Sequence, residues 1–304
     1  MCVFSRGANP FLKTNTHTME TLKDKVAYSI DLLKRGEKLA KALNPADGYI
    51  VGFSGGKDSQ VLLDLVKRSG VLYKAHYSVV SIDPPENVYF IRENYPEVKF
   101  IHHHPNFFRL VEQKGLPTIW HRFCCAKLKE GIGAGSVCLV GVRAEESKKR
   151  AAYTELDIRS RRKEHEGMRG KRTLQQIEEN EHRCIKGKDK VMLYPLLKWT
   201  ETDIWQYIKE RHIAVNPLYE EHKRVGCMFC PFAKRNEVQQ WCDRYPKFKE
   251  RLLKSLQIYL DKRKWQDKKE VRSAEDYFDW WLSGKKLDEY ISLKRQTAIC
   301  YEGK

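Results

Sequence analysis

The sequence predicts an α/β fold: a parallel twisted sheet with helices on both faces, followed by a helical C-terminal region. Short apolar runs alternate with segments whose apolar residues recur at helical spacing, which is typical of βαβ units. The first apolar run, 49–53, leads directly into a Ser-Gly-Gly-Lys-Asp-Ser turn, and a helical pattern follows at once. Ligands of such sheets bind beyond the carboxyl ends of the strands, so this turn is a candidate site.

The elements are predicted in chain order. Apolar residues at helical spacing predict a helix over 18–43, which Asn44-Pro45 ends. Thr200 is predicted to begin a later helix by accepting a hydrogen bond from the Asp203 amide. Aromatic-rich helices are expected from 234 onward. The predicted strands span 49–53, 75–82, 99–103 and 137–143. One predicted helix follows the glycine turn and ends near residue 70, and another spans 87–94. Ordered structure is expected again over 191–197.

The chain is expected to divide into three parts. Residues 1–47 form an N-terminal helical segment, and residues 48–215 form a nucleotide-binding α/β domain. Residues 216–304 carry a Cys-x-x-Cys segment and the helical C-terminal region. Within the second part, 151–190 is rich in Lys and Arg and poor in apolar residues, and it is predicted to be a basic insertion beside the cleft.

The turn Ser54–Ser59 has the chemistry of an anion cradle. Gly55 and Gly56 let backbone N–H groups approach phosphate oxygens, and the helix that follows adds its dipole. Lys57 supplies a mobile positive charge. The spacing matches neither Walker A nor the three-glycine dinucleotide fingerprint. The alternative is a Gly-Gly turn capped by Ser and Asp before an ordinary helix.

Composition favours a globular protein that binds polyanions. The net charge is +17, from 57 Lys and Arg against 40 Asp and Glu, and 41% of the residues are hydrophobic. Such a charge attracts nucleotides or nucleic acid, although solvated lysines also favour solubility. No apolar run reaches the length of a membrane span, and the first residues do not resemble a signal peptide. We therefore expect a cytoplasmic protein with no membrane partner.

Four of the nine cysteines have the spacing of metal ligands. Cys124 and Cys125 are adjacent, and Cys227 and Cys230 form a Cys-x-x-Cys turn followed by proline. Four thiolates suit either a [4Fe–4S] cluster or a zinc ion, and ligand type alone does not separate them. Cys184 is the candidate to replace one of the adjacent pair. The alternative is that these cysteines are small buried hydrophobes.

Several polar residues follow predicted strands. Ser54, Asp83, His102–His104 and Arg143 are all expected at carboxyl ends, where they would share one cleft. Arg143, in the segment Gly141–Ser147, has the geometry to bind phosphate or sulfate with two donors. The alternative for that segment is a surface loop with balanced charge. The three histidines alternate across a strand end, so solvated or core positions are favoured over a metal site.

Together these segments resemble the phosphoadenosine phosphosulfate (PAPS) reductase family of the PP-loop, adenine nucleotide α-hydrolase-like superfamily. The similarity covers about 48–232. The segments that carry it are Ser54–Ser59, Cys124-Cys125, Gly141–Ser147, Tyr194–Leu196 and Cys227–Cys230.

The resemblance implies a nucleotide site, with ATP, adenylyl sulfate (APS) or PAPS as ligand. The PP-loop, which is the turn Ser54–Ser59, would hold phosphate or sulfate. Residues near 51–53 and 81–83 would meet the adenosine, and Arg143 would face the anionic end. The paired cysteines resemble the [4Fe–4S] set of adenylyl-sulfate reductases. The implied nucleotide-binding residues are Val51, Phe53, Ser54, Gly55, Gly56, Lys57, Asp58, Ser59, Asp83, Gly141 and Arg143.

The C-terminal sequence decides between activities within this resemblance. Sulfonucleotide reductases carry a nucleophilic cysteine in a Glu-Cys-Gly segment, whereas Cys300 here lies in Ala-Ile-Cys-Tyr-Glu. The favoured reading is an ATP pyrophosphatase that serves sulfur transfer to DNA or tRNA, with Lys57, Asp58, Arg143 and Mg²⁺ in catalysis. Asp58 would either hold the metal or cap the helix. A sulfur-donor protein such as a cysteine desulfurase is an implied partner. The alternatives are sulfite release from APS or PAPS, and non-catalytic binding of nucleotide and cluster.

Overall fold

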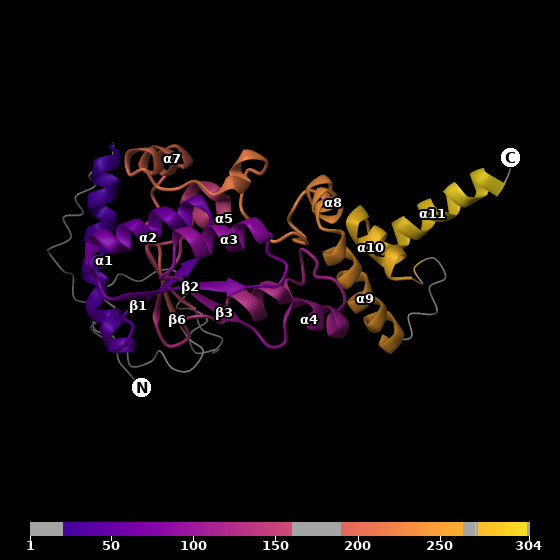
Figure 1. Cartoon of the computed structure of the whole chain (residues 1–304), viewed down its shortest axis with the longest axis horizontal. Coiled ribbons are helices and arrows are strands. Elements are labelled where there is room, and N and C mark those ends of the chain that lie inside the picture. Colours follow the sequence, from indigo (N-terminus) through magenta and orange to yellow (C-terminus); the bar gives the residue numbers. More distant parts are fainter. Residues whose placement is uncertain (1–20, 160–189, 264–270, 272, 303–304) are drawn as a thin grey trace, which may run out of the picture.

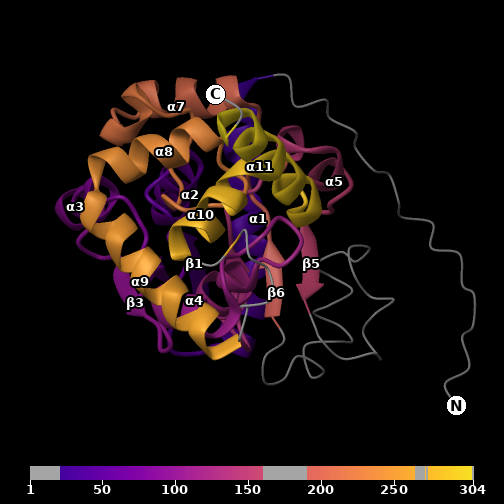
Figure 2. The same ribbon diagram turned by 90° about the vertical axis from the view of Figure 1, so that its right-hand side faces the viewer.

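A mostly parallel sheet organises the protein. The computed structural model describes residues 21–159, 190–263, 271 and 273–302. Within these residues six strands pair in the order β3-β2-β1-β4-β6-β5, and β5 alone runs antiparallel, against β6. Figure 2 shows β3 and β5 at opposite edges of this sheet. The strands are β1 (Tyr49–Phe53), β2 (Tyr73–Val79), β3 (Lys99–His102), β4 (Val137–Leu139), β5 (Leu156–Arg159) and β6 (Lys190–Leu193).

Helices surround the sheet and continue beyond its carboxyl edge, which confirms the predicted fold class. In Figure 1, α1 lies on the left, the sheet in the middle and α8 to α11 on the right. The helices are α1 (Leu22–Leu43), α2 (Lys57–Ser69), α3 (Pro85–Asn94), α4 (Phe107–Lys114), α5 (Lys148–Ala151), α7 (Glu201–Glu210), α8 (Arg235–Arg244), α9 (Pro246–Arg263), α10 (Ala274–Ser283) and α11 (Leu287–Glu302). Short turns of other helix types are η1 (Cys125–Lys129), η2 (Ala144–Glu146) and η5 (Pro217–Glu220).

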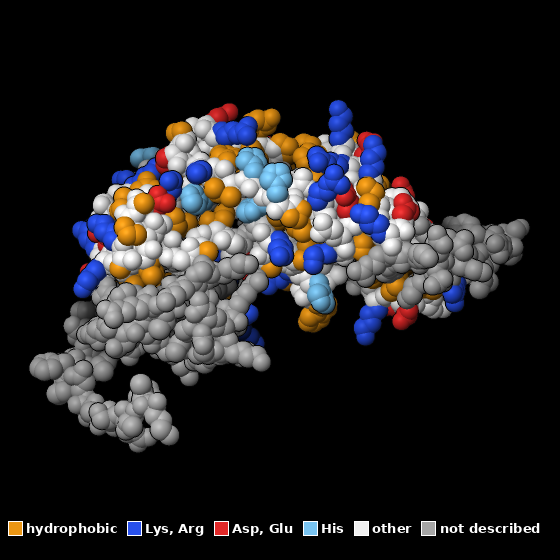
Figure 3. Space-filling view, turned by 90° about the horizontal axis from the view of Figure 1, so that it is seen from below, with side chains coloured by type: hydrophobic (Ala, Val, Ile, Leu, Met, Phe, Trp, Pro, Cys, Tyr) orange, Lys and Arg blue, Asp and Glu red, His pale blue; other side chains and the backbone are white. Residues whose placement is uncertain are grey.

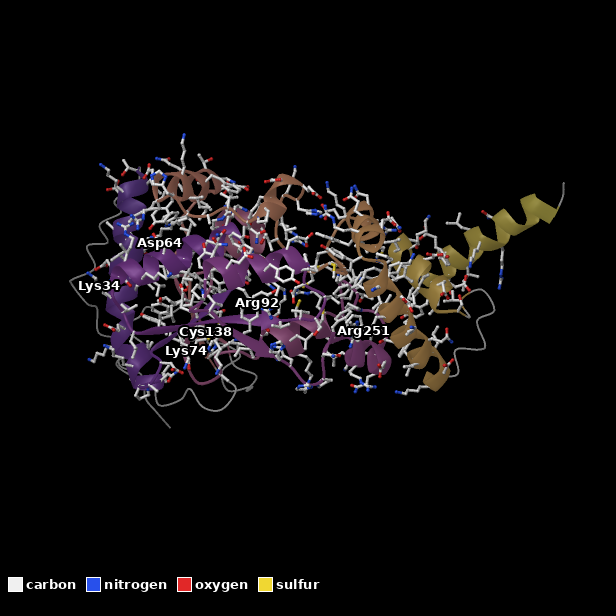
Figure 4. All side chains as sticks on the ribbon, viewed as in Figure 1. Lys34, Asp64, Lys74, Arg92, Cys138 and Arg251 are labelled. Atoms are coloured by element: carbon white, nitrogen blue, oxygen red, sulfur yellow. The ribbon has the colours of Figure 1, made fainter. Side chains whose placement is uncertain are left out.

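The first core lies between the sheet and helices α1, α2, α3 and α7. Buried Val51, Leu62 and Trp199 belong to it. Asp64 on α2, labelled in Figure 4, accepts a 2.6 Å hydrogen bond from the hydroxyl of Tyr207 on α7. This contact fixes α7 against α2 and thereby positions the N-terminus of α7 near the PP-loop.

The second core joins segments from both sides of residue 215. Phe108 of α4, Cys124 and Leu128 pack with Met228 and with α8, α9 and α10. Arg251 on α9, labelled in Figure 4, places its guanidinium 4.3 Å from the ring centroid of Phe108. Residues 107–128 therefore share a core with the Cys-x-x-Cys segment, and the two cysteine motifs meet in space.

Three strands end earlier than predicted: β3 by one residue, at His102, and β2 and β4 by more. β2 ends at Val79 because Ser81 adopts a left-handed backbone with φ 71°, which no strand residue has. β4 ends at Leu139, and the amide of Val142 then donates to the carbonyl of Val140 in a tight turn. The helix α1 begins at Leu22 with Thr21 as its cap. The predicted cap of α7 is confirmed, since the Thr200 hydroxyl accepts from the Asp203 amide.

Among the described residues, none of the helices combines the length and apolar character that a membrane span requires.

Candidate functional site

A cavity of about 220 Å³ lies against the sheet at the boundary between β1 and β4. At this boundary the order in which successive strands are added to the sheet reverses. Ile50 and Gly52 of β1 line it, and Ser54 lies at the end that meets the PP-loop. Asp83 and Lys129 line it beyond β2. Doubly wound sheets bind ligands at this switch point, because the loops diverge there and leave a crevice.

Two buried asparagines fix the PP-loop. Gly55 has φ +76°, and a Cβ added to it would lie 2.2 Å from Oδ1 of Asn87. Asn87 donates to the carbonyl of Ser54 at 3.1 Å. Asn216, which is fully buried, donates to the carbonyl of Gly55 at 3.0 Å and to Oδ1 of Asn87 at 2.8 Å. The loop conformation therefore requires glycine at position 55, and the two asparagine side chains stabilise it.

Three further donors of the loop are bonded within the protein. The hydroxyl of Ser59 donates to the carbonyl of Gly56 at 2.8 Å and accepts from the amide of Ser54 at 3.2 Å. The amide of Lys57 donates to the hydroxyl of Tyr219 at 2.8 Å. A hydroxyl group thus already lies at the N-terminus of α2, where an anion would bind.

The predicted catalytic residues form one ion-pair network. The ammonium of buried Lys57 lies 3.6 Å from Oδ2 of Asp58 and 3.4 Å from Oε1 of Glu201. Buried Arg143 donates from Nε to Oδ1 of Asp58 at 2.6 Å and binds Glu145 at 2.7 Å. Burial lowers the pKa of Arg143, but the neighbouring carboxylates outweigh it, so that the pKa is raised and the charge is kept.

Gly141 and Val51 have structural positions. A Cβ on Gly141 would lie 2.9 Å from the carbonyl of Asp58, so glycine lets the loop after β4 reach α2. Val51 is fully buried in the first core and does not line the cavity, whereas its neighbour Phe53 does. Ile50 and Gly52, which line the cavity, point to the opposite face of the sheet from Val51, whereas Phe53 reaches the cavity at the last position of β1.

Asp83 closes the cavity beyond β2. Its Oδ2 accepts a 2.7 Å hydrogen bond from the amide of Val80, and burial raises its pKa against the opposing charge of Lys129. The left-handed Ser81 turns the chain so that this carboxyl folds back. The carbonyl of Ile82 accepts a 3.0 Å hydrogen bond from the amide of Met228, which lies inside the Cys-x-x-Cys motif. The cavity wall and the cysteine loop are therefore directly connected.

The four predicted metal ligands interact with one another. Cys124 and Cys125 share a hydrogen bond between their thiols, which raises the pKa of Cys124 and lowers that of Cys125. Cys227 interacts electrostatically with Cys124 and with Cys230. Burial raises the pKa of Cys227 to about 11 against the charge of Lys129, which also bonds its sulfur. Conversely, the charge of Cys227 raises the pKa of Lys129.

The described cysteines are all free thiols. Across the described part of the chain, no three His, Cys, Asp or Glu side chains converge closely enough to hold a single metal ion. Cys184 and the side chain of Cys300 lie outside the described residues, as does most of the basic insertion.

The three histidines do not share the cavity, contrary to the expectation from strand ends. β3, which precedes them, is an edge strand and β2 separates it from β1. His103 instead bonds the hydroxyl of Ser78 at 2.7 Å. Arg143 does not line the cavity either, because its partner Asp58 holds it on α2.

Some residues of the site gave no recognisable signal in the sequence. Asn216 and Tyr219 reach the PP-loop from η5, and Glu201 reaches it from the first turn of α7. Asn216-Pro217 is a turn signal that marks where η5 begins, but not what the side chain binds.

Comparison with known proteins agrees with this geometry. The phosphoadenosine phosphosulfate reductase domain matches residues 48–233, which contain the cavity, the PP-loop and all four cysteines. The chain belongs to this family. The match confirms the resemblance inferred from the sequence motifs.

Relatives of this PAPS reductase family member are distant. An uncharacterized protein of Methanocaldococcus jannaschii is 26% identical over 78% of this chain and 53% of its own length. The adenosine 5′-phosphosulfate reductase of Staphylococcus haemolyticus is 24% identical over 60% of this chain and 70% of its own. The chain thus spans about half the length of the first of these relatives. The phosphoadenylyl-sulfate reductase of Candida auris in a phosphate complex is similar with TM-score 0.41 and 14% identity, over 68% of this chain and 95% of that one.

Proposed function

We propose that this protein binds ATP and catalyses attack on its α-phosphate with release of pyrophosphate, in the service of sulfur transfer to nucleic acid. The observation that carries the proposal is the position of Ser54. Ser54 lines the cavity and is also the first residue of the PP-loop, which carries Lys57 and Asp58 of the ion-pair network with Arg143. A ligand with an apolar ring and an anionic tail fits this order of surfaces.

In the proposed complex the adenosine occupies the cavity and the phosphates meet the N-terminus of α2. A phosphate oxygen would replace the Tyr219 hydroxyl at the Lys57 amide, since both are hydrogen-bond acceptors there. The Lys57 ammonium would supply positive charge to the phosphates. Arg143 keeps Asp58 from repelling the anion, because it neutralises the carboxylate.

The proposed reaction is a displacement at phosphorus. An acceptor oxygen forms a bond to the α-phosphorus, the bond from this phosphorus to the α,β-bridging oxygen breaks, and pyrophosphate leaves with the electron pair. Lys57 and the loop amides stabilise the charge that builds on the phosphate oxygens. We propose Mg²⁺ as the counter-ion of the β- and γ-phosphates. It is commonly held by one or two carboxylates and by the substrate itself, and exposed Glu201, 3.4 Å from the Lys57 ammonium, is a candidate ligand.

We further propose that Cys124, Cys125, Cys227 and Cys230 hold a [4Fe–4S] cluster. The four thiols interact, yet among the described residues no three ligands converge on a single ion. Four thiolates suit either a [4Fe–4S] cluster or a zinc ion, so the proposal of a cluster rests on the resemblance of the paired cysteines to those of adenylyl-sulfate reductases.

The test is an assay of anaerobically purified protein with ATP and a nucleic-acid acceptor fraction. We expect pyrophosphate and adenylylated acceptor in equal amounts, and the loss of both in Lys57→Met. Lys67→Met is the matched control, because Lys67 lies on the same helix α2 but pairs with Glu97 at the surface. Equal activity of the wild type and Lys57→Met would contradict the proposal. ATP binding without any pyrophosphate would instead indicate a non-catalytic binding module.

The second candidate is reduction of APS or PAPS to sulfite. The cysteine set and the relative named adenosine 5′-phosphosulfate reductase favour it. It requires a nucleophilic thiol, for which Cys300 is the candidate. Sulfite release from APS that disappears in Cys300→Ser, with no pyrophosphate from ATP, would establish this reading in place of the first.

A further inference from the structure

An exposed turn next to the cysteines presents aromatic side chains to solvent. Within the turn 117–122, Trp120 is 85% exposed and Ile119 is 47% exposed. Phe232, which follows the Cys-x-x-Cys motif, is 53% exposed. Large apolar side chains exposed in one place indicate an interaction site rather than a packing function.

The turn is held firmly from beneath. The indole of Trp281 on α10 donates to the carbonyl of Pro117 at 2.6 Å. Gly115, with φ +73°, lies against Tyr259 and Tyr277, where an added Cβ would come within 3.0 Å of both. Inside the turn, the amide of His121 donates to the hydroxyl of Thr118 at 3.1 Å. Trp120 is therefore exposed because the backbone holds it out.

Arginines accompany the exposed rings. The guanidinium of Arg122 lies 5.1 Å from the ring centroid of Phe232, and that of Arg224 lies 4.0 Å from the sulfur of Cys230. Both arginines are exposed, and within the described part of the chain no ion pair involves either. Figure 3 shows Lys and Arg side chains spread over one face of the molecule, with acidic side chains sparser among them.

This surface continues into the proposed nucleotide site. The carbonyl of Arg122 accepts a 3.2 Å hydrogen bond from the amide of Ala126, which lies in the helical turn η1 that ends at Lys129. Lys129 lines the cavity and bonds Cys227. A chain bound at Trp120 thus lies beside the cysteines and within reach of the cavity mouth.

We propose that Trp120, Phe232, Arg122 and Arg224 form a platform for single-stranded nucleic acid, which identifies the docking site of the acceptor and rests on the function proposed above. An unpaired base stacks on Trp120, and the two guanidinium groups bind neighbouring phosphates. Aromatic rings interleaved with arginines are the usual surface for unpaired strands, since every base offers a π-face and the backbone a negative charge.

A protein partner fits this surface less well. The exposed apolar side chains are few and are separated by charged groups, whereas a stable protein interface needs a larger continuous patch. Duplex nucleic acid also fits less well, because its bases are already stacked and cannot reach an indole ring.

The experiment measures binding of a fluorescein-labelled single-stranded RNA 15-mer and of a blunt duplex of equal length to the full-length protein, without ATP. We expect the wild type to prefer the single strand and Trp120→Ala to weaken that binding by about tenfold. Trp120→Phe should restore most of it. Tyr89→Ala is the matched control, since Tyr89 is an aromatic residue 60% exposed on α3. Arg122→Gln should reduce the slope of log affinity against log salt by about 0.7.

The proposal is overturned if Trp120→Ala binds the single strand as the wild type does, or if the duplex binds more tightly. Thermal unfolding of each variant verifies that the exposed substitution leaves the fold intact. The result is separable from the catalytic proposal. Loss of strand binding in Trp120→Ala supports the platform even if no pyrophosphate forms, and pyrophosphate formation without this loss would leave only the catalytic proposal standing.

Discussion

Arg143 and Asp58 form a 2.6 Å ion pair between the loop after β4 and the first turn of α2. Both side chains are largely shielded from solvent. The pair links the segments that follow the neighbouring strands β1 and β4. It also neutralises Asp58 beside Lys57 of the PP-loop.

Arg143→Gln is expected to lower the free energy of unfolding by about 2 kcal/mol, because Asp58 keeps its charge and loses its strongest hydrogen bond. Arg143→Lys should fall between, since it keeps the charge but not the two-donor geometry. Denaturant unfolding measures both. Arg211→Gln is the matched control: its pair with Asp64 is more exposed and should contribute less than about 1 kcal/mol. An equal effect of the two glutamine variants would contradict the importance of the buried pair.

Gly55→Ala should abolish measurable ATP binding and destabilise the fold. Its φ of +76° opposes any side chain, and its added Cβ would strike Asn87. Gly70→Ala isolates the backbone strain, because Gly70 has φ +73° but no atom within 4 Å of an added Cβ. We expect a cost of about 1 kcal/mol at Gly70 and about 2 kcal/mol more at Gly55. Isothermal titration with ATP and thermal unfolding provide the readouts, and indistinguishable melting of the two variants would refute the steric explanation.

Asn216→Ala is expected to weaken ATP binding by about tenfold and to destabilise the protein by about 2 kcal/mol, because it leaves the Gly55 carbonyl and Asn87 without their buried donor. Asn94→Ala is the control, since Asn94 bonds the carbonyl of Phe90 within its own helix. If ATP affinity is unchanged in Asn216→Ala, the loop does not depend on this contact.

The stability contributed by Asp203 should disappear in acid. Burial raises the pKa of Asp203, but hydrogen bonds from Lys25 and Thr200 outweigh burial and bring the pKa below its ordinary value of 3.8. A group with a lowered pKa stabilises the fold fully above that ordinary value and loses its contribution as pH falls through the lowered one. Asp203→Asn should therefore cost about 1 kcal/mol at neutral pH. The difference from the wild type should shrink below about pH 4, and a constant difference in unfolding free energy down to pH 3 would argue against this assignment.

Iron content provides the test of the cysteine set. Cys227→Ser should lose the cluster and its visible absorption, since Cys227 interacts with both Cys124 and Cys230. Cys242→Ser should keep about four irons per chain, because Cys242 is buried in the second core on α8 and lies outside the set. Zinc in place of iron in the anaerobically purified protein would contradict the cluster assignment.

Local features were predictable because their causes are contiguous in the chain. The strand 49–53, the glycine turn and the helix after it follow one another, and so do Thr200 and Asp203 of the α7 cap. Strand ends were less predictable, since Ser81 and Gly141 stop β2 and β4 through backbone geometry that apolar patterning does not reveal. The antiparallel β5 lies within the predicted basic insertion, where few apolar residues mark it.

The sequence by itself determined the family, the anion-binding turn and the residue types available for chemistry, because each depends on neighbouring residues with fixed spacing. Only the tertiary structure decided which groups surround that turn. Asn216 and Tyr219 reach it from 161 and 162 residues away, respectively, and Met228 brings the cysteine loop to the cavity wall through one backbone hydrogen bond. Such contacts depend on how packed helices orient their side chains, and this is settled by the shared core rather than by any local pattern.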